Sequence, residues 1–215
     1  MVKLSTKQKM WLVFSICLLV AFVAFTLIVA FVDVNDGVGL SHLNHPIWQR
    51  CGKSEIWETI TDWLGYLTIL ALLFCVGMQI WQWMRRKGLQ KVDWNLIVLD
   101  IVCAGLVAVY VFFEFVVVNY RPMLENGVAK ASYPSSHAML FVTGLFLSMY
   151  QIWHYVKSKP WRIVLTVLIS TVMVIGVVGR LLAGVHWFTD IFAGVLISGF
   201  LCCLFMCLID KNSTN

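Results

Sequence analysis

The sequence is poor in charged residues. Only 13% of its 215 residues are Asp, Glu, Lys or Arg, and 60% are hydrophobic, whereas soluble domains carry about 25% charged residues. A soluble chain of this length could not bury so much apolar surface in its own interior. The composition therefore excludes a soluble enzyme and indicates that lipid solvates much of the chain.

Proline is scarce as well, with four residues, and the long apolar runs contain little proline or glycine. No internal repeat or low-complexity linker divides the chain. The seven cysteines include no C-x-x-C pair, a spacing typical of metal sites and redox motifs. Six cysteines lie within apolar runs, where we expect small buried side chains and no disulfide framework. The sequence predicts a single domain over residues 1–215 without a metal site.

Six apolar stretches reach or approach the about 20 residues that a helix needs to cross a bilayer. We predict an all-α integral membrane protein whose six transmembrane helices form one bundle. The net charge of +5 does not indicate nucleic-acid binding, because the basic residues lie at the ends of apolar runs and form no continuous face. The predicted spans are residues 11–32, 63–84, 96–118, 135–155, 163–179 and 186–209.

Lysine and arginine are distributed unequally between the two sides of this bundle. The side that holds both termini carries 11 of the 16 basic residues, many of them in the loops 85–91 and 157–162. Because cytoplasmic loops are enriched in Lys and Arg, we expect both termini in the cytoplasm. The loop 33–62 and the short loops containing Arg121 and Arg180 then face outside.

The outer loop 33–62 contains Trp48 and Trp57 among polar residues. Tryptophan favours the membrane interface, so we predict a helix lying on the outer surface around residues 54–63. Such a helix would serve as an interfacial anchor or gate the access of lipid.

Three segments on the predicted outer side carry polar residues of catalytic types. Residues 119–123 read NYRPM, residues 133–137 read YPSSH, and residues 179–190 read GRLLAGVHWFTD. Charged residues at membrane depth are costly and usually functional. We therefore expect these three segments to form one site.

Each residue type in these segments has a chemical use. Arg121 and Arg180 offer planar forks of donors that match phosphate oxygens. Ser135 is a good N-cap, and the helix that it begins would present unpaired N–H groups to an anion. His137 lies in the first turn of that helix.

His186 and Asp190 are four positions apart, which places them one turn apart on one face of a helix. Asp190 can then hold one ring nitrogen of His186 and leave the other basic and nucleophilic. His137 can protonate the leaving oxygen as general acid. The pattern predicts a metal-independent phosphatase site.

The three segments resemble the motifs K-x6-R-P, P-S-G-H and S-R-x5-H-x3-D of the type-2 phosphatidic acid phosphatase superfamily, the lipid phosphate phosphatases. Residues 121–122 match the end of the first motif. Residues 134–137 match the second with serine for glycine, and residues 179–190 match the third with glycine for the first serine. The resemblance covers about residues 60–210.

The resemblance implies a small bacterial enzyme of the plasma membrane that takes a lipid phosphate from the bilayer and needs no cofactor. The reaction would run through a phosphohistidine on His186, with Asp190 as its partner and His137 as the acid. The phosphate would be bound by Arg121, Ser135, Ser136 and Arg180.

The chain departs from the first motif seven positions before Arg121, where the family has lysine and this sequence has Glu114. A carboxylate pointing into the site would repel phosphate. We expect Glu114 to pair with Arg121 or Lys130, and Lys130 either supplies the missing cation or is a solvated loop residue.

The sequence leaves the lipid open among undecaprenyl diphosphate, phosphatidylglycerophosphate and phosphatidate, and an outward-facing site favours the first. A lipid phosphotransferase on the same scaffold and a non-catalytic lipid-binding or transport protein are the alternatives. Lipid binding alone would not need His137, His186 and Asp190 together, so these residues favour catalysis. The oligomeric state is left open.

Overall fold

The computed structural model describes residues 4–123 and 127–210. Within these ranges every regular element is helical, apart from two isolated β-bridges. The elements are α1 (Thr6–Phe31), α2 (Ser41–Cys51), α3 (Glu55–Arg86), η1 (Leu89–Lys91), α4 (Trp94–Phe115), α5 (Ser136–Met139), η2 (Leu140–Gly144), α6 (Leu145–Tyr155), α7 (Lys159–Ala183) and α8 (Phe188–Ile209).

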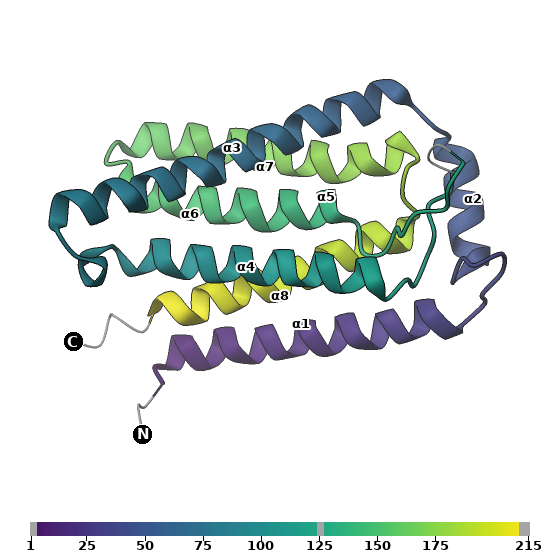
Figure 1. Cartoon of the computed structure of the whole chain (residues 1–215), viewed down its shortest axis with the longest axis horizontal. Helices are drawn as coiled ribbons and strands as arrows, with labels where there is room; N and C mark the ends of the chain where they lie inside the picture. The colour runs from purple at the N-terminus through teal and green to yellow at the C-terminus, as the bar shows by residue number, and fades with distance from the viewer. Residues whose placement is uncertain (1–3, 124–126, 211–215) are drawn as a thin grey trace.

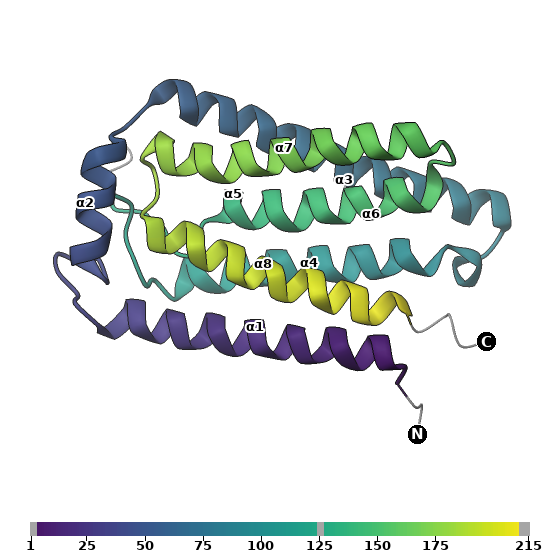
Figure 2. The ribbon, with the colours of Figure 1, turned by 180° about the vertical axis from the view of Figure 1, so that it is seen from behind.

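The long helices lie side by side along one axis, and α2 lies across one end of the bundle (Figures 1 and 2). The first turn of α1 and the last turn of α8 meet at the opposite end, where the Ser5 hydroxyl donates to the Asp210 carboxylate at 2.6 Å. Helix α8 packs against α1, α4, α5 and α7 and is therefore the centre of the bundle.

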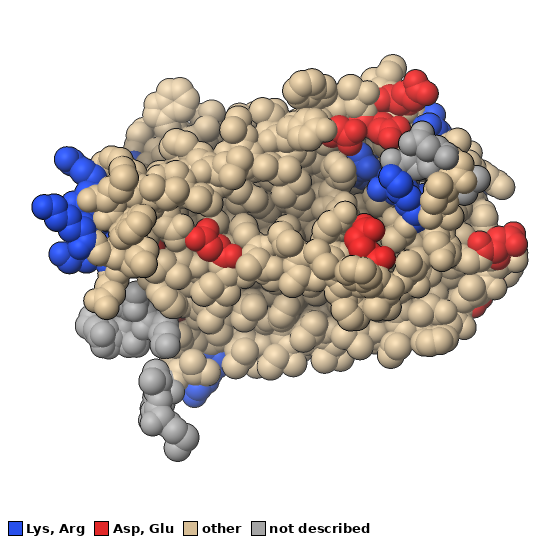
Figure 3. All heavy atoms as spheres, in the orientation of Figure 1, with Lys and Arg blue, Asp and Glu red and all other residues tan. Residues whose placement is uncertain are grey.

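Five helices, α1, α3, α4, α7 and α8, are long and apolar enough to cross a membrane. The predicted span at residues 135–155 is instead a succession of α5, the π-helical turn η2 and α6. Figure 3 shows a broad band of uncharged side chains between two charged ends, with Lys and Arg alone at the end opposite α2 and Lys and Arg mixed with Asp and Glu near the α2 end. The protein is an all-helical, multi-pass membrane protein, and the count of six spans stays a prediction.

Helices α1 and α3 begin earlier than their apolar runs, and a serine side chain caps each of them. Helix α3 begins at Glu55 rather than near residue 63, and the Ser54 hydroxyl accepts the Trp57 N–H group at 3.4 Å. The surface helix expected at residues 54–63 is therefore the first part of α3. The helix that covers the end of the bundle is α2.

Two clusters of buried apolar side chains fill the bundle. One surrounds Leu147 and Phe205, and the other surrounds Tyr133 and Ile197 nearer to α2. Cys17, which we expected to be buried, is exposed on α1, where the neighbouring exposed side chains Phe14 and Val20 are apolar enough to face lipid.

Candidate active site

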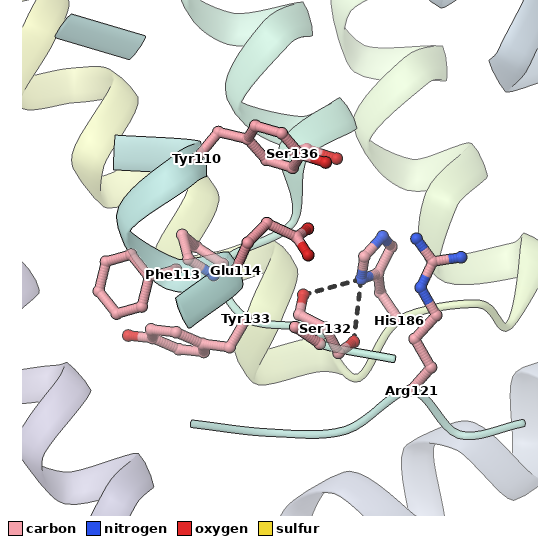
Figure 4. Close-up of a pocket in the computed structure, with 10 residues that line it drawn as sticks. Tyr110, Phe113, Glu114, Arg121, Ser132, Tyr133, Ser136 and His186 are labelled. Atoms are coloured by element: carbon pink, nitrogen blue, oxygen red, sulfur yellow. Dashed lines mark hydrogen bonds between the residues drawn. The ribbon is translucent and has the colours of Figure 1, made fainter. Parts of the chain in front are cut away.

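The three predicted segments meet at the end of the bundle that α2 covers. Arg121 comes from the connection between α4 and α5, and Ser136 and His137 begin α5. Arg180 lies in the last turn of α7, and His186 precedes α8. The fold thus brings together residues that are far apart in the sequence (Figure 4).

The connection between α4 and α5 folds back on itself. The Arg121 N–H group donates to the Lys130 carbonyl at 3.0 Å, and the Ser132 N–H group donates to the Asn119 carbonyl at 2.9 Å. This pairing holds Arg121 and Ser132 beside the same hollow, which His186 also lines.

The two ring nitrogens of His186 have different surroundings. Nδ1 lies 3.1 Å from the Ser132 carbonyl oxygen and 3.1 Å from the Ser132 hydroxyl. A carbonyl can only accept, so this contact places the proton on Nδ1. Nε2 is buried, and no described residue makes a hydrogen bond to it. Its lone pair therefore faces the hollow shown in Figure 4.

Asp190 reaches His186 through Ser132. The Ser132 hydroxyl donates to Asp190 Oδ2 at 2.5 Å, whereas the same oxygen is 3.9 Å from His186 Nδ1. The expected direct hydrogen bond is not formed, because α8 begins only at Phe188 and His186 is not in its helical turn. Ser132 was missed from the sequence, where its only signal is its place just before the P-S-S-H run.

Buried amide side chains fix the carboxylate of Asp190. Asn119 Nδ2 donates to Asp190 Oδ1 at 2.8 Å, while Asn119 Oδ1 accepts the Gly39 N–H group at 2.9 Å. Asn44 of α2 donates to the Thr189 hydroxyl at 2.8 Å and accepts the Thr189 N–H group at 3.2 Å. Helix α2 and the turn before it therefore hold the start of α8, a role that the sequence did not indicate.

Arg180 is buried and held by the first turns of α3. One of its terminal nitrogens, NH1, donates to Asp62 Oδ1 at 2.9 Å and to the Thr61 hydroxyl at 3.1 Å. The same Asp62 oxygen lies 3.3 Å from His137 Nε2. Neither Asp62 nor Thr61 was predicted, because both fall at the boundary of the expected outer loop and no motif marks them.

Ser135 is the N-cap of α5, as the sequence predicts. Its hydroxyl accepts the Ala138 N–H group at 3.4 Å, and its own N–H group donates to the Asp190 carbonyl at 3.0 Å. The side chain is fully buried. Phosphate binding by Ser135 and Ser136 stays a prediction.

Ser136 joins two adjoining hollows. One is also lined by Arg121 and His186, and the other by His137 and Asp62. The candidate nucleophile and the candidate acid therefore face the same stretch of space from two sides.

Glu114 ends α4 beside the first hollow, and its carboxylate points into the space in front of His186 and Arg121 (Figure 4). Lys130 is exposed on the returning part of the connection. The pairing of Glu114 with Arg121 or Lys130 stays a prediction, but the orientation of Glu114 is the one that repels phosphate.

Burial lowers the pKa of His186 below its usual value of about 6.5. The positive charges of Arg180 and Arg121 add to this shift, and the negative charge of nearby Asp190 opposes it. The imidazole is consequently neutral at neutral pH. A neutral ring protonated on Nδ1 has its Nε2 lone pair available for attack.

The sequence profile of the PAP2 superfamily matches residues 67–214, and this range includes all the predicted catalytic residues. The chain belongs to the PAP2 superfamily. No curated protein sequence matches it significantly.

Two solved PAP2-type structures are similar to this member of the superfamily. A transmembrane PAP2 type phosphatidylglycerolphosphate phosphatase from Bacillus subtilis is 15% identical, with 89% of this chain and 94% of that chain covered and a TM-score of 0.67. LpxE from Aquifex aeolicus is 19% identical, with 76% and 94% covered and a TM-score of 0.46. The first similarity shows that this chain has the fold of a membrane lipid phosphatase.

Proposed function

We propose that this PAP2 superfamily member hydrolyses a lipid phosphate monoester or diphosphate through a phosphohistidine on His186, without a metal ion. The observation that carries the proposal is the buried Nε2 atom of His186. It has no hydrogen-bond partner among the described residues, its ring is fixed through Nδ1, and it faces a hollow that Arg121 also lines.

In the first step Nε2 of His186 attacks phosphorus and the bond to the lipid oxygen breaks. His137 gives a proton to that oxygen as general acid. The imidazolium that forms keeps its Nδ1–H group donating to the Ser132 carbonyl, near the negative charge of Asp190. In the second step His137 takes a proton from water, which cleaves the phosphorus–nitrogen bond and releases phosphate.

The phosphate oxygens would be held by Arg121, Arg180 and the N–H groups at the start of α5. Arginine forks and helix N-termini both suit phosphate. The hollow beside His137 continues along Tyr66, Ile69 and Leu140, so an apolar tail can leave the polar end of the site and lie among helices that face lipid.

The substrate class includes undecaprenyl diphosphate, phosphatidylglycerophosphate and phosphatidate. We place the site at the outer face of a bacterial plasma membrane, since the Lys- and Arg-rich end of the bundle is opposite to it. An outward site favours undecaprenyl diphosphate, because that lipid is released after wall building on the outer side.

The deciding experiment is phosphate release by the purified protein in detergent, with EDTA present, from each of the three lipids. We expect release by the wild type and none above background by His186→Ala. Trapping of an acid-labile phosphoenzyme in the wild type alone would support the phosphohistidine. Release that continues in His186→Ala, or stops with EDTA and returns with a divalent metal, would contradict the mechanism.

A further inference from the structure

Asp62 contacts two residues of the proposed reaction with a single oxygen atom. Its Oδ1 lies 2.9 Å from Arg180 NH1 and 3.3 Å from His137 Nε2. These two partners come from different helices, α7 and α5, while Asp62 lies on α3. One carboxylate therefore connects the candidate acid with a candidate phosphate ligand.

The burial of the three side chains shows which of them needs the contact. The Arg180 side chain is 3% exposed, that of His137 is 30% exposed and that of Asp62 is 41% exposed. A buried guanidinium needs a charge partner, whereas a carboxylate so exposed could be solvated by water. The arrangement therefore orients Arg180 and His137 more than it stabilises Asp62.

Two glycines let α3 approach closely enough for this contact. A Cβ atom at Gly179 of α7 would lie 2.6 Å from Thr61 Cγ2, and one at Gly65 of α3 would lie 3.4 Å from His137 Cδ2. The absence of a side chain at residue 179 brings the start of α3 against α7, so Asp62 reaches Arg180 and His137 at once.

We propose that Asp62 is a positioning residue that holds the general acid His137 and the phosphate ligand Arg180 in their working orientation. The inference rests on the proposed function. In the resting site Asp62 occupies the Nε2–H donor of His137. When a lipid phosphate binds, its ester oxygen takes this place and the His137 imidazolium gives its Nε2 proton to that oxygen. In the second step Nε2 takes a proton from the attacking water, and the restored Nε2–H group again donates to Asp62. Donors fixed in advance need no reorganisation during the reaction.

The test is the dependence of the rate on the leaving group. General acid catalysis matters for an alkyl alcohol, which leaves poorly without a proton, and little for 4-nitrophenolate, which leaves unprotonated. We would measure kcat for phosphatidate and for 4-nitrophenyl phosphate with the wild type, Asp62→Asn and Asp62→Ala. A loss of folded protein lowers both apparent kcat values by the same factor, so it does not change their ratio.

We expect Asp62→Asn to lower kcat for phosphatidate about tenfold, and kcat for 4-nitrophenyl phosphate less than about twofold. Asp62→Ala should change the ratio further. Because His137 carries the effect, Asp62→Asn should not change the ratio in a His137→Ala background. Glu55→Gln is the matched control, since Glu55 is an exposed carboxylate of the same helix, and it should keep the wild-type ratio.

An equal loss for both substrates would show a merely structural role and overturn the inference. Faster turnover or a lower KM in Asp62→Asn would also overturn it, because Asp62 would then compete with the phosphate for His137 and Arg180 instead of positioning them. A wild type that releases no phosphate from any lipid would instead refute the proposed function, so the two failures are distinguishable.

Discussion

The chemistry of single residues depends here on a serine between a histidine and an aspartate. The Ser132 hydroxyl bridges His186 Nδ1 and Asp190 Oδ2. We expect Ser132→Ala to lower kcat about ten- to hundredfold, because a hydrogen bond to a charged group contributes about 1.5–3 kcal/mol. The KM should change little, since in the proposed mechanism Ser132 stabilises an imidazolium that forms only during the reaction.

Phosphate release at saturating lipid measures this effect. Ser132→Thr keeps a hydroxyl and is the matched control, with activity above that of Ser132→Ala. Wild-type turnover in Ser132→Ala would mean that Asp190 acts on His186 without the serine.

Glu114 is the residue at which this chain departs most from its superfamily. Its carboxylate faces the hollow that contains Arg121 and His186. We expect Glu114→Lys to lower the KM for a lipid phosphate about five- to tenfold, because a repulsive charge becomes an attractive one at an exposed position.

Glu55→Lys makes the same change of charge on an exposed residue at the start of α3 and should leave the KM within about twofold. Unchanged or lost activity in Glu114→Lys would argue against the simple explanation that the site lacks only the positive charge of the family lysine. A pairing with Arg121 or Lys130 would then be the better account.

The sequence could predict the candidate site residues that lie within motifs, but not those that lie outside them. His137, Arg180 and His186 have fixed spacings within short segments, so a pattern finds them. Ser132 and Asp62 have no such spacing, and folding brings them to the site from outside the motifs. Their types are common in loops and at helix starts, so apart from the place of Ser132 just before the P-S-S-H run, the sequence does not distinguish them.

At the scale of helices, Gly179 shows how packing limits a substitution that the motif would suggest. The family has serine there, and the sequence alone presents the exchange as the loss of a hydroxyl. In the structure, a Cβ atom at residue 179 would lie 2.6 Å from Thr61 Cγ2 and 3.0 Å from the Trp57 ring. Thr61 is fully buried and its branched side chain cannot move aside easily.

We therefore expect Gly179→Ser to destabilise the protein by about 1–3 kcal/mol, as overpacking usually does. The melting temperature in detergent should fall, and activity should fall with it because α3 carries Asp62. Gly77→Ser is the matched control, since a Cβ there meets nothing within 4 Å. A Gly179→Ser variant as stable as the wild type would mean that α3 and α7 can separate.

The apolar runs predict the long helices well because lipid-facing helices must be apolar along their length. They predict helix ends poorly, since the first turns of α3 are polar and the Ser54 cap, not hydrophobicity, sets where it begins. Helix α2 escaped prediction because it has 11 residues, a polar composition and an internal proline, Pro46. Its role in holding the start of α8 follows only from the tertiary contacts of Asn44.

At the scale of the whole molecule, the two ends of the bundle differ. The start of α1 and the end of α8 lie at one end, and the site lies at the other under α2 (Figures 1 and 2). On the face shown in Figure 3, the end away from the site carries Lys and Arg without Asp or Glu, whereas the end near the site carries both signs of charge. If the basic end faces the cytoplasm, as we predict from the Lys and Arg distribution, the site would use only lipids whose phosphate reaches the outer leaflet.

The orientation of the protein in the membrane can be tested with Cys51, which ends α2 and is partly exposed. The other six cysteines lie in the apolar helices α1, α3, α4 and α8. A charged, membrane-impermeant maleimide added to intact cells should therefore label the wild type, and Cys51→Ser should abolish most of the labelling.

A second variant reports on the opposite side. Lys87 follows α3 at the basic end, so Lys87→Cys in the Cys51→Ser background should be labelled only after the membrane is permeabilised. Labelling of both Cys51 and the cysteine at position 87 in intact cells would mean that the reagent crosses the membrane. The reverse pattern would place the site in the cytoplasm, and the proposed substrates would narrow to lipid phosphates made on that side.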